Sequence, residues 1–285
     1  MRKDYILIDK KEDCISGIEF IENYWSNQWL HDANQNSVIA YCGVANEEEY
    51  SIMKPYLETL PKRSRLLDAG CGLGQWTAFL TKEGFEVYGV DISKSTIELL
   101  RSKFPNLKFA HGDVRNLEFP DNYFDAAFAW GVFEHFEEGL QPCIVESFRV
   151  LRPGGYLFLS VPYHNLRHIL CGFSRWESWD QFLATALKKN DSIGPNVVRF
   201  FQWRLTTPEL SRELAIGGFK VLETHPITIS LILQRLRAAP TLFALRPGTI
   251  SYKLTRWFLQ HLPVRAFAHM IMGVGQKPGD ASMRA

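Results

Sequence analysis

The most informative segment of this 285-residue chain reads Leu66-Leu67-Asp68-Ala69-Gly70-Cys71-Gly72-Leu73-Gly74-Gln75-Trp76. A short apolar run ends at Ala69, glycines follow at every second position, and a helical pattern then extends to Gly84. Because glycine has no side chain, a ligand can lie directly against the backbone of such a loop. The segment therefore predicts a strand, a ligand-binding loop and a helix in immediate succession.

The same alternation of strand and helix continues along the chain. Further strands are expected at 85–90, 107–110, 125–130, 156–161, 219–223 and 269–275. Helices are expected at 93–104, with Ser93 as cap, at 143–151, and from Thr207-Pro208-Glu209, with a threonine cap, to Gly217. Pro153-Gly154-Gly155 is expected to end the second of these helices. Strands that alternate with helices form parallel sheets covered on both faces, so we expect a doubly wound α/β fold.

Three segments fall outside this alternation. Residues 1–60 place Tyr24, Trp25 and Trp29 at helical spacing, which predicts a helical lead-in that caps a domain spanning 61–285. Residues 163–204 are rich in aromatic side chains and are expected to form an inserted cover. A second, helical insertion is expected at 230–265, before the last strand.

The composition is that of an ordinary globular protein. The net charge is +1, so the molecule as a whole has no field that would concentrate nucleic acid. The five cysteines contain no C-x-x-C pair, which argues against a disulfide framework or a zinc site and favours a reducing, cytoplasmic location. The N-terminal apolar patch is short and no apolar run reaches about 18 residues, so we expect neither a signal peptide nor a spanning helix.

Three carboxylates follow three successive strands of the predicted sheet. Asp68 ends the first strand, where it would repel a phosphate but hold an ammonium or sulfonium group. Asp91 ends the second strand, where an acid of a nucleotide-type site accepts the ribose hydroxyls. Asp113 ends the third, beside Val114, which suits an adenine amino group and its ring. Gln75 replaces the third glycine of a dinucleotide fingerprint, and no Walker lysine follows the loop, so pyrophosphate and nucleoside triphosphate sites are disfavoured.

These motifs resemble the class I S-adenosylmethionine-dependent methyltransferases, particularly the small-molecule group that includes quinone-biosynthesis enzymes. The matching segments are 67–74, 89–93, 111–114, 124–130 and 151–155, and the resemblance returns at 206–223 and 269–277. It implies a mostly parallel seven-stranded sheet with an antiparallel last strand, and S-adenosylmethionine as cofactor. The cofactor-binding residues that the motifs and the resemblance together indicate are Asp68, Gly70, Gly72, Gly74, Gln75, Asp91, Ile92, Asp113, Val114 and Trp130.

Catalytic residues are harder to choose, because alignment of the two substrates can supply much of the rate of methyl transfer. A base is needed only for a neutral hydroxyl or a protonated amine. Glu134 and His135, which follow the fourth strand, are the first candidates, and His164 is the second. Both sites have a structural alternative, since similar Glu-His pairs occur in the family without catalytic roles and His164 is also suited to a cap. Relatives that bind a divalent metal have a glutamate where this chain has Gly131, so no metal is expected.

The acceptor is indicated only by class. After the fourth strand the chain lacks the Asn-Pro-Pro run of nucleic-acid amino methyltransferases, so we expect methyl transfer to O, N or C of a small organic molecule and no nucleic-acid partner. A catalytically silent S-adenosylmethionine-binding sensor or assembly subunit is the alternative, and a nicotinamide oxidoreductase is a third interpretation that Gln75 weakens. The sequence does not indicate the oligomeric state.

The C-terminal part of the chain is an electrostatically distinct region. Seven lysines and arginines, and no acids, lie between Thr224 and Gly279, and an amphipathic pattern spans 253–262. One interpretation is a structural cover with a solvated basic face. The other is weak peripheral contact of 230–265 with an anionic membrane, or guidance of a phosphorylated or lipid-linked acceptor.

Overall fold

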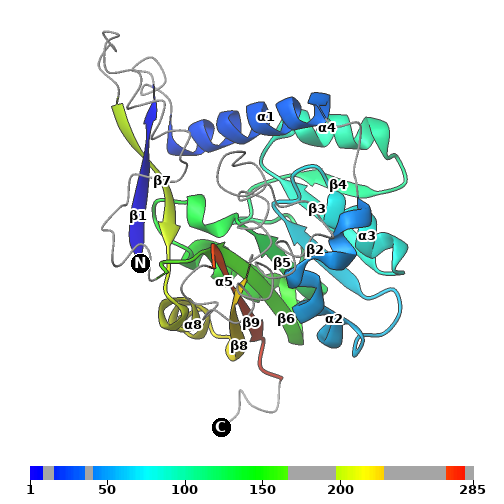
Figure 1. Cartoon of the computed structure of the whole chain (residues 1–285). Coiled ribbons are helices and arrows are strands. Elements are labelled where there is room, and N and C mark those ends of the chain that lie inside the picture. Colours follow the sequence, from blue (N-terminus) through cyan, green and yellow to red (C-terminus); the bar gives the residue numbers. More distant parts are fainter. Residues whose placement is uncertain (9–15, 36–40, 166–196, 228–267, 280–285) are drawn as a thin grey trace, which may run out of the picture.

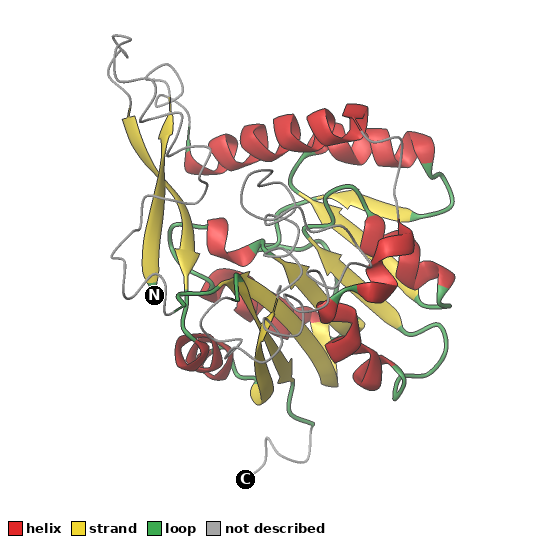
Figure 2. Ribbon diagram, viewed as in Figure 1, coloured by secondary structure: helices red, strands yellow, loops and turns green. Residues whose placement is uncertain are grey.

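The computed structural model describes residues 1–8, 16–35, 41–165, 197–227 and 268–279. A central sheet with helices on both faces dominates the molecule, and a separate two-stranded ribbon lies at one side (Figures 1 and 2). The expected inserted helix at 230–265 and most of the expected aromatic cover lie outside the described residues. None of the helices within the described ranges has the length and apolar character needed to cross a membrane.

The central sheet has seven strands in the order β4-β3-β2-β5-β6-β9-β8. They are β2 (Arg65–Ala69), β3 (Glu86–Asp91), β4 (Lys108–His111), β5 (Phe124–Trp130), β6 (Leu151–Pro162), β8 (Lys220–Ile227) and β9 (Met270–Gln276). The pairs among the first five strands in this order are parallel, whereas β9 is antiparallel to both of its neighbours. The expected doubly wound sheet with an antiparallel last strand is therefore confirmed.

The helices cover the two faces of this sheet. The helices that pack on or beside the sheet are α2 (Glu48–Leu57), α3 (Gln75–Lys82), α4 (Lys94–Lys103), α5 (Gln141–Val150) and α8 (Thr207–Ile216). Two short turns of 3-10 helix, η2 (Tyr41–Asn46) and η3 (Phe133–His135), interrupt the loops. Each helix begins or ends near an edge of the sheet, so that the loops carrying the candidate site residues collect at the carboxyl ends of the strands.

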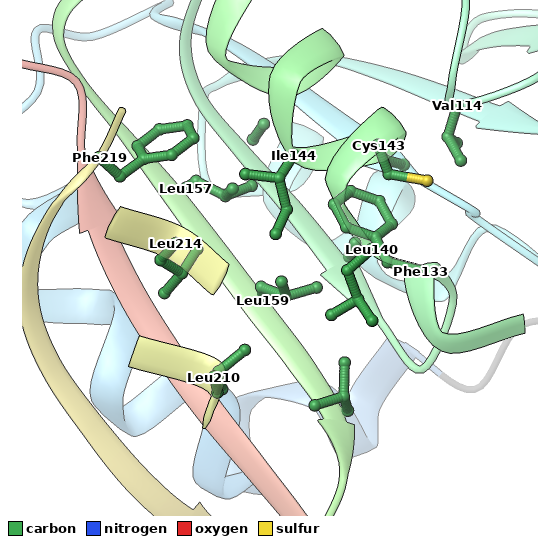
Figure 3. Close-up of a cluster of buried hydrophobic side chains, with 14 of the residues drawn as sticks. Val114, Phe133, Leu140, Cys143, Ile144, Leu157, Leu159, Leu210, Leu214 and Phe219 are labelled. Atoms are coloured by element: carbon green, nitrogen blue, oxygen red, sulfur yellow. The ribbon is translucent and has the colours of Figure 1, made fainter. Parts of the chain in front are cut away.

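Alternation along each strand divides the core into two clusters. Ala127 and Ala129 of β5 face α5 and α8, whereas Ala126 and Phe128 face α2 and α3. Figure 3 shows the first cluster, in which Leu157 and Leu159 of β6 lie beneath apolar side chains of α5 and α8. The second cluster buries Trp76 and Phe79 of α3. Burial on both faces explains why these strands are continuous apolar runs.

Three local expectations were wrong. The helix α5 ends at Val150 and β6 begins at once, so Pro153-Gly154-Gly155 lies inside the strand, at a shift of register opposite β5. There Gly154 N donates to the carbonyl of Lys277, which ties the turn to the segment after β9. The cap of α8 is Thr206 rather than Thr207, because Thr206 and Glu209 form a reciprocal capping box.

The N-terminal lead-in is the third segment that differs from the expectation. The helix α1 (Gly17–Gln35) agrees with the expectation, but β1 (Arg2–Ile8) is a strand. It pairs antiparallel with β7 (Val197–Arg204), the end of the segment expected to be an aromatic cover. Figure 1 shows α1 running across the top of the molecule from this ribbon to α4. The side-chain hydroxyls of Ser26 and Ser93, 2.8 Å apart, join α1 to the N-terminus of α4.

Candidate functional site

A cavity of about 740 Å³ lies between α1 and the loops at the carboxyl ends of the strands. Its floor consists of the glycine loop and the ends of β2, β3 and β5, and its roof is one face of α1. Of the expected cofactor-binding residues, the structure brings the following into the described lining: Asp68, Gly70, Gly72, Gln75, Asp91, Ile92, Val114 and Trp130. Gly74 and Asp113 are not part of that lining.

The glycine loop adopts backbone angles that favour glycine. Gly70, Gly72 and Gly74 have φ values of 84°, 50° and 72°. A Cβ atom on Gly70 would lie 2.4 Å from Val132, and one on Gly72 would lie 2.9 Å from the indole of Trp29. A Cβ on Gly74 would instead meet Phe109 at 2.7 Å, inside the protein. Gly74 is therefore a packing position, whereas Gly70 and Gly72 keep the loop thin beneath the cavity.

Two buried carboxylates form the acidic part of the floor. Gly72 N and Ser93 N each donate a hydrogen bond of 2.9 Å to Asp91, one to each carboxylate oxygen. Burial raises the pKa of Asp91, and these backbone donors oppose that rise. Burial also raises the pKa of Asp68 to about 7, although Thr77 Oγ1 donates a hydrogen bond of 2.7 Å to Oδ2. Within the described part of the chain, neither carboxylate forms an ion pair with a lysine or an arginine.

The adenine motif divides between the cavity and the surface. Ile92 and Val114 line the cavity, as expected. Asp113 instead forms a bidentate ion pair with Arg115, whose Nη2 lies 2.7 Å from Oδ2. Because Arg115 follows by only two residues, its side chain reaches back to Asp113. The Asp113 carboxylate is therefore paired with the Arg115 guanidinium in this structure and does not line the cavity.

The roof comes from residues outside the sequence motifs. Four residues on one face of α1 line the cavity: Ile21, Trp25, Trp29 and Asp32. Trp25 and Trp29 stack on each other, with ring centroids 5.3 Å apart. The helical spacing of the two tryptophans was visible in the sequence, but nothing local indicated that this face would cover the glycine loop. Trp76 and Trp130 also line the cavity, and their ring centroids lie 5.0 Å apart.

His135 is the one catalytic candidate that lines the cavity. Its Nδ1 lies 2.9 Å from the carbonyl oxygen of Phe201, and its ring contacts Trp25 and Phe201 with centroid distances of 5.0 Å. Burial lowers the pKa of His135 to about 4, so the ring is neutral at neutral pH. The backbones of Phe201 and Gly131 both hydrogen-bond the ring and oppose this lowering. Because the Phe201 carbonyl oxygen can only accept, its contact favours the tautomer with the proton on Nδ1 and the lone pair on Nε2.

The other two catalytic candidates lie outside the described lining. Glu134 is 1% exposed and sits beneath Gly131, where burial raises its pKa to about 8. Among the described residues, its Oε2 has no hydrogen-bond partner. His164 is half-buried at the end of β6, and its backbone N–H donates to the carbonyl of Leu205. Burial, with Arg2 and Arg204 nearby, lowers its pKa. The structure therefore groups neither side chain with His135 at the cavity surface.

Part of the chain around this site matches a known family model. Residues 67–159 match the family model described as "Methyltransferase domain". A probable S-adenosylmethionine-dependent methyltransferase of Mycolicibacterium smegmatis is 34% identical over 97 residues, which cover 34% of this chain and 37% of that protein. A demethylmenaquinone methyltransferase of a Geobacillus species is 28% identical over 145 residues, covering 48% of this chain and 60% of that protein. The chain thus matches about a third to three fifths of the length of these relatives.

The fold extends further than the sequence similarity. The phosphoethanolamine N-methyltransferase 2 of Haemonchus contortus, solved with S-adenosyl-L-methionine, superposes with a TM-score of 0.58 at 18% identity. The superposition covers 93% of this chain and 60% of the other. This likeness supports the same sheet architecture over most of the chain. It carries no information on the acceptor, because the identity is too low.

Proposed function

The chain carries a methyltransferase domain of the class I S-adenosylmethionine-dependent family, and from this premise we propose that it transfers the methyl group of S-adenosylmethionine to a small organic acceptor. The observation that carries the proposal is the cavity, which joins a thin glycine loop, two buried acids and an aromatic roof. The described lining contains three carboxylates and no lysine or arginine. Such a cavity suits a ligand with cationic groups.

The chain's residues fit S-adenosylmethionine in a specific arrangement. Asp91 would accept the two ribose hydroxyls, since a carboxylate offers about four lone-pair directions and the hydrogen bonds from Gly72 N and Ser93 N do not use all of them. Asp68 would hold the cationic methionine end, which would relieve its unfavourable burial. Ile92 and Val114 would flank the adenine, and Gly72 would let the ligand approach the loop. When bound, S-adenosylmethionine supplies a methyl group on a sulfonium that departs as a neutral thioether.

The acceptor would lie where the roof meets the end of β5. Trp25 and His135 both line this part of the cavity, as does Phe136. We propose that Nε2 of His135 takes the proton from an acceptor hydroxyl or amine while the aromatic walls hold the acceptor in line and exclude water. Glu134 would act only indirectly, because it is buried, outside the described lining, and protonated at neutral pH.

The aromatic surroundings favour an apolar acceptor with a ring. The described lining offers no cation for a phosphate group. One of the seven cations of the C-terminal region, Lys277, is also unavailable, since its Nζ donates to Asn122 and to the carbonyls of Phe148 and Leu151. The other six cations of that region lie outside the described residues. A small acceptor without a phosphate group is therefore the simpler proposal.

Ligand binding and labelled methyl transfer test this function. S-adenosylhomocysteine at about a hundredfold excess over Kd should stabilise the protein by about 2.7 kcal/mol, and NAD should not. Incubation of the protein with methyl-labelled S-adenosylmethionine and a cell extract should then yield labelled metabolites that mass spectrometry can identify. Stabilisation by NAD alone would overturn the assignment. Binding of S-adenosylhomocysteine without any label transfer would favour the silent binding protein instead.

A further inference from the structure

The loop that carries His135 is held by a strand that lies far away in the sequence. We call residues 131–136 the reaction loop. His135 Nδ1 donates to the carbonyl of Phe201, and the carbonyl of Phe136 accepts a hydrogen bond of 3.0 Å from Trp203 Nε1. Glu134 lies within electrostatic reach of Arg204. Three consecutive residues of the reaction loop therefore face β7, more than sixty positions along the chain.

The strand β7 in turn pairs with β1. The two strands form a two-stranded sheet, in which residues 2–8 face residues 197–204. An isolated two-stranded ribbon is marginally stable in water, so it needs additional contacts to keep one position. The buried ion pair between Asp4 of β1 and Arg204 of β7 supplies one, with side-chain exposures of 4% and 3%. Gln202 Nε2 also donates to Asp4, at 3.1 Å.

This arrangement links Asp4 to the chemistry of His135. The Phe201 carbonyl accepts from Nδ1 of His135 and so favours a proton on that nitrogen, and Phe201 lies three residues from Arg204 on the same strand. If β7 shifted away, Nδ1 would lose its acceptor, and the neutral ring would be free to place its proton on Nε2 instead. A ring protonated on Nε2 has no lone pair there to accept a proton from an acceptor.

We propose that Asp4 is a positioning residue: through Arg204 it holds β7 against the reaction loop, and the Phe201 carbonyl then keeps His135 protonated on Nδ1. The proposal rests on the proposed function only in treating His135 as the base. The ribbon is thereby part of the active site, although neither Asp4 nor Arg204 belongs to the described lining of the cavity.

Nitrogen-15 NMR of the histidine-labelled full chain measures the tautomer directly. The signal of His135 is assigned by its loss in His135→Gln. At neutral pH the wild-type ring should be protonated on Nδ1. In Asp4→Asn, which keeps the shape of the side chain but removes its charge, a substantial population should be protonated on Nε2. A wild-type ring protonated on Nε2 would overturn the proposal whatever the variants do.

The rate of label transfer from S-adenosylmethionine to a cell extract is the second readout. Asp4→Asn should lower this rate by about tenfold or more, while the affinity for S-adenosylhomocysteine stays within about twofold, because the floor of the cavity is untouched. Arg2→Ala, at an exposed position of the same strand, is the matched control and should leave both quantities unchanged. A merely structural role would lower stability without moving the tautomer of the folded protein.

A double-mutant cycle tests whether Asp4 acts through Arg204. The variant Asp4→Asn with Arg204→Gln should be no slower than Asp4→Asn alone, since both changes remove the same contact. The double variant also leaves neither Asp4 nor Arg204 as an unpaired buried charge, so it can be compared with wild type if the single variant does not fold. An unchanged tautomer with a rate within about threefold of wild type in either folded variant would overturn the proposal. If wild type transfers no label at all, the proposed function fails, while the tautomer comparison still decides this inference.

Discussion

The floor and the roof of the cavity are built in different ways. The floor comes from one continuous part of the chain, residues 68–136, whose lining residues lie at the carboxyl ends of strands, in the loops that follow them or at the start of α3. The roof comes from α1, and the ribbon that supports it joins residues 2–8 to residues 197–204. The floor therefore depends on local backbone geometry, whereas the roof depends on packing between remote segments.

This difference separates binding from catalysis in the proposed enzyme. The buried acids and the glycine loop of the floor keep their geometry through hydrogen bonds within the sheet domain, such as that from Gly72 N to Asp91. His135 lies at the junction, since it follows β5 but is fixed by Phe201 and Trp25. Changes in the floor should thus act on cofactor affinity, and changes at the junction should act on turnover.

The largest effect is expected at the junction. His135→Ala should lower turnover by about 10² to 10⁴-fold at neutral pH and leave the cofactor affinity nearly unchanged, because only the proposed base is lost. Since the pKa of His135 is about 4, the wild-type rate should fall only as the pH drops toward that value and the ring becomes charged. Steady-state label transfer measures both. His164→Ala is the control, and a loss below about tenfold at every pH would return His135 to a structural role.

Substitutions in the floor should change the affinity for the cofactor. Asp91→Ala should weaken binding of S-adenosylhomocysteine by about 1.5 to 3 kcal/mol, because it removes charge-assisted hydrogen bonds to the ribose and leaves Gly72 N without its acceptor. Isothermal titration calorimetry gives the value. Asp113→Ala is the matched control, since Arg115 holds that carboxylate outside the described lining, and it should change the affinity little. Equal losses in both variants would mean that Asp113 turns into the cavity when ligand binds.

The sequence predicted the floor well because its signals are local. A strand, a glycine loop and a helix within eleven residues leave little freedom, and the cap of α4 at Ser93 was correct for the same reason. Asp113 shows the limit of such reasoning, because it lies two residues after β4, close to the expected place, but the pattern did not reveal that Arg115 would form an ion pair with its carboxylate. The position of a backbone is easier to predict than the partner of a charged side chain.

The roof was predicted only in part. The spacing of Trp25 and Trp29 indicated α1, but the ribbon was missed because β1 (residues 2–8) and β7 (residues 197–204) pair across about two thirds of the chain and neither has a hairpin partner nearby. The aromatic residues Phe201 and Trp203 were assigned to a cover insertion, whereas β7 uses them to contact the reaction loop. No periodicity within one segment encodes such long-range contacts.

The affinity for S-adenosylmethionine should also depend on pH, through Asp68 in the floor of the cavity. The pKa of Asp68 is raised to about 7 in the free protein, and a cationic ligand would favour its ionised form and lower that pKa. Binding then releases a proton below about pH 7, so the affinity for S-adenosylmethionine should rise about tenfold between pH 6 and pH 8. Calorimetry across this range tests the sign. Asp68→Asn should flatten the profile, and an affinity that falls with pH would contradict the role of Asp68.

The smallest effect is expected where the roof touches the floor. Trp29 lies against Gly72, at the part of the loop that the cofactor would approach, but it contributes a wall and no charge. Trp29→Leu should therefore weaken binding of S-adenosylhomocysteine by about three- to tenfold, or about 1 kcal/mol, the size expected for one aromatic contact. Asn27→Ala, at an exposed position of the same helix, should have no effect in the same calorimetric titration. If Trp29→Leu matched Asp91→Ala, the roof would hold the cofactor as firmly as the floor does, and the division between the two regions would be wrong. If it changed nothing, α1 would serve the acceptor alone.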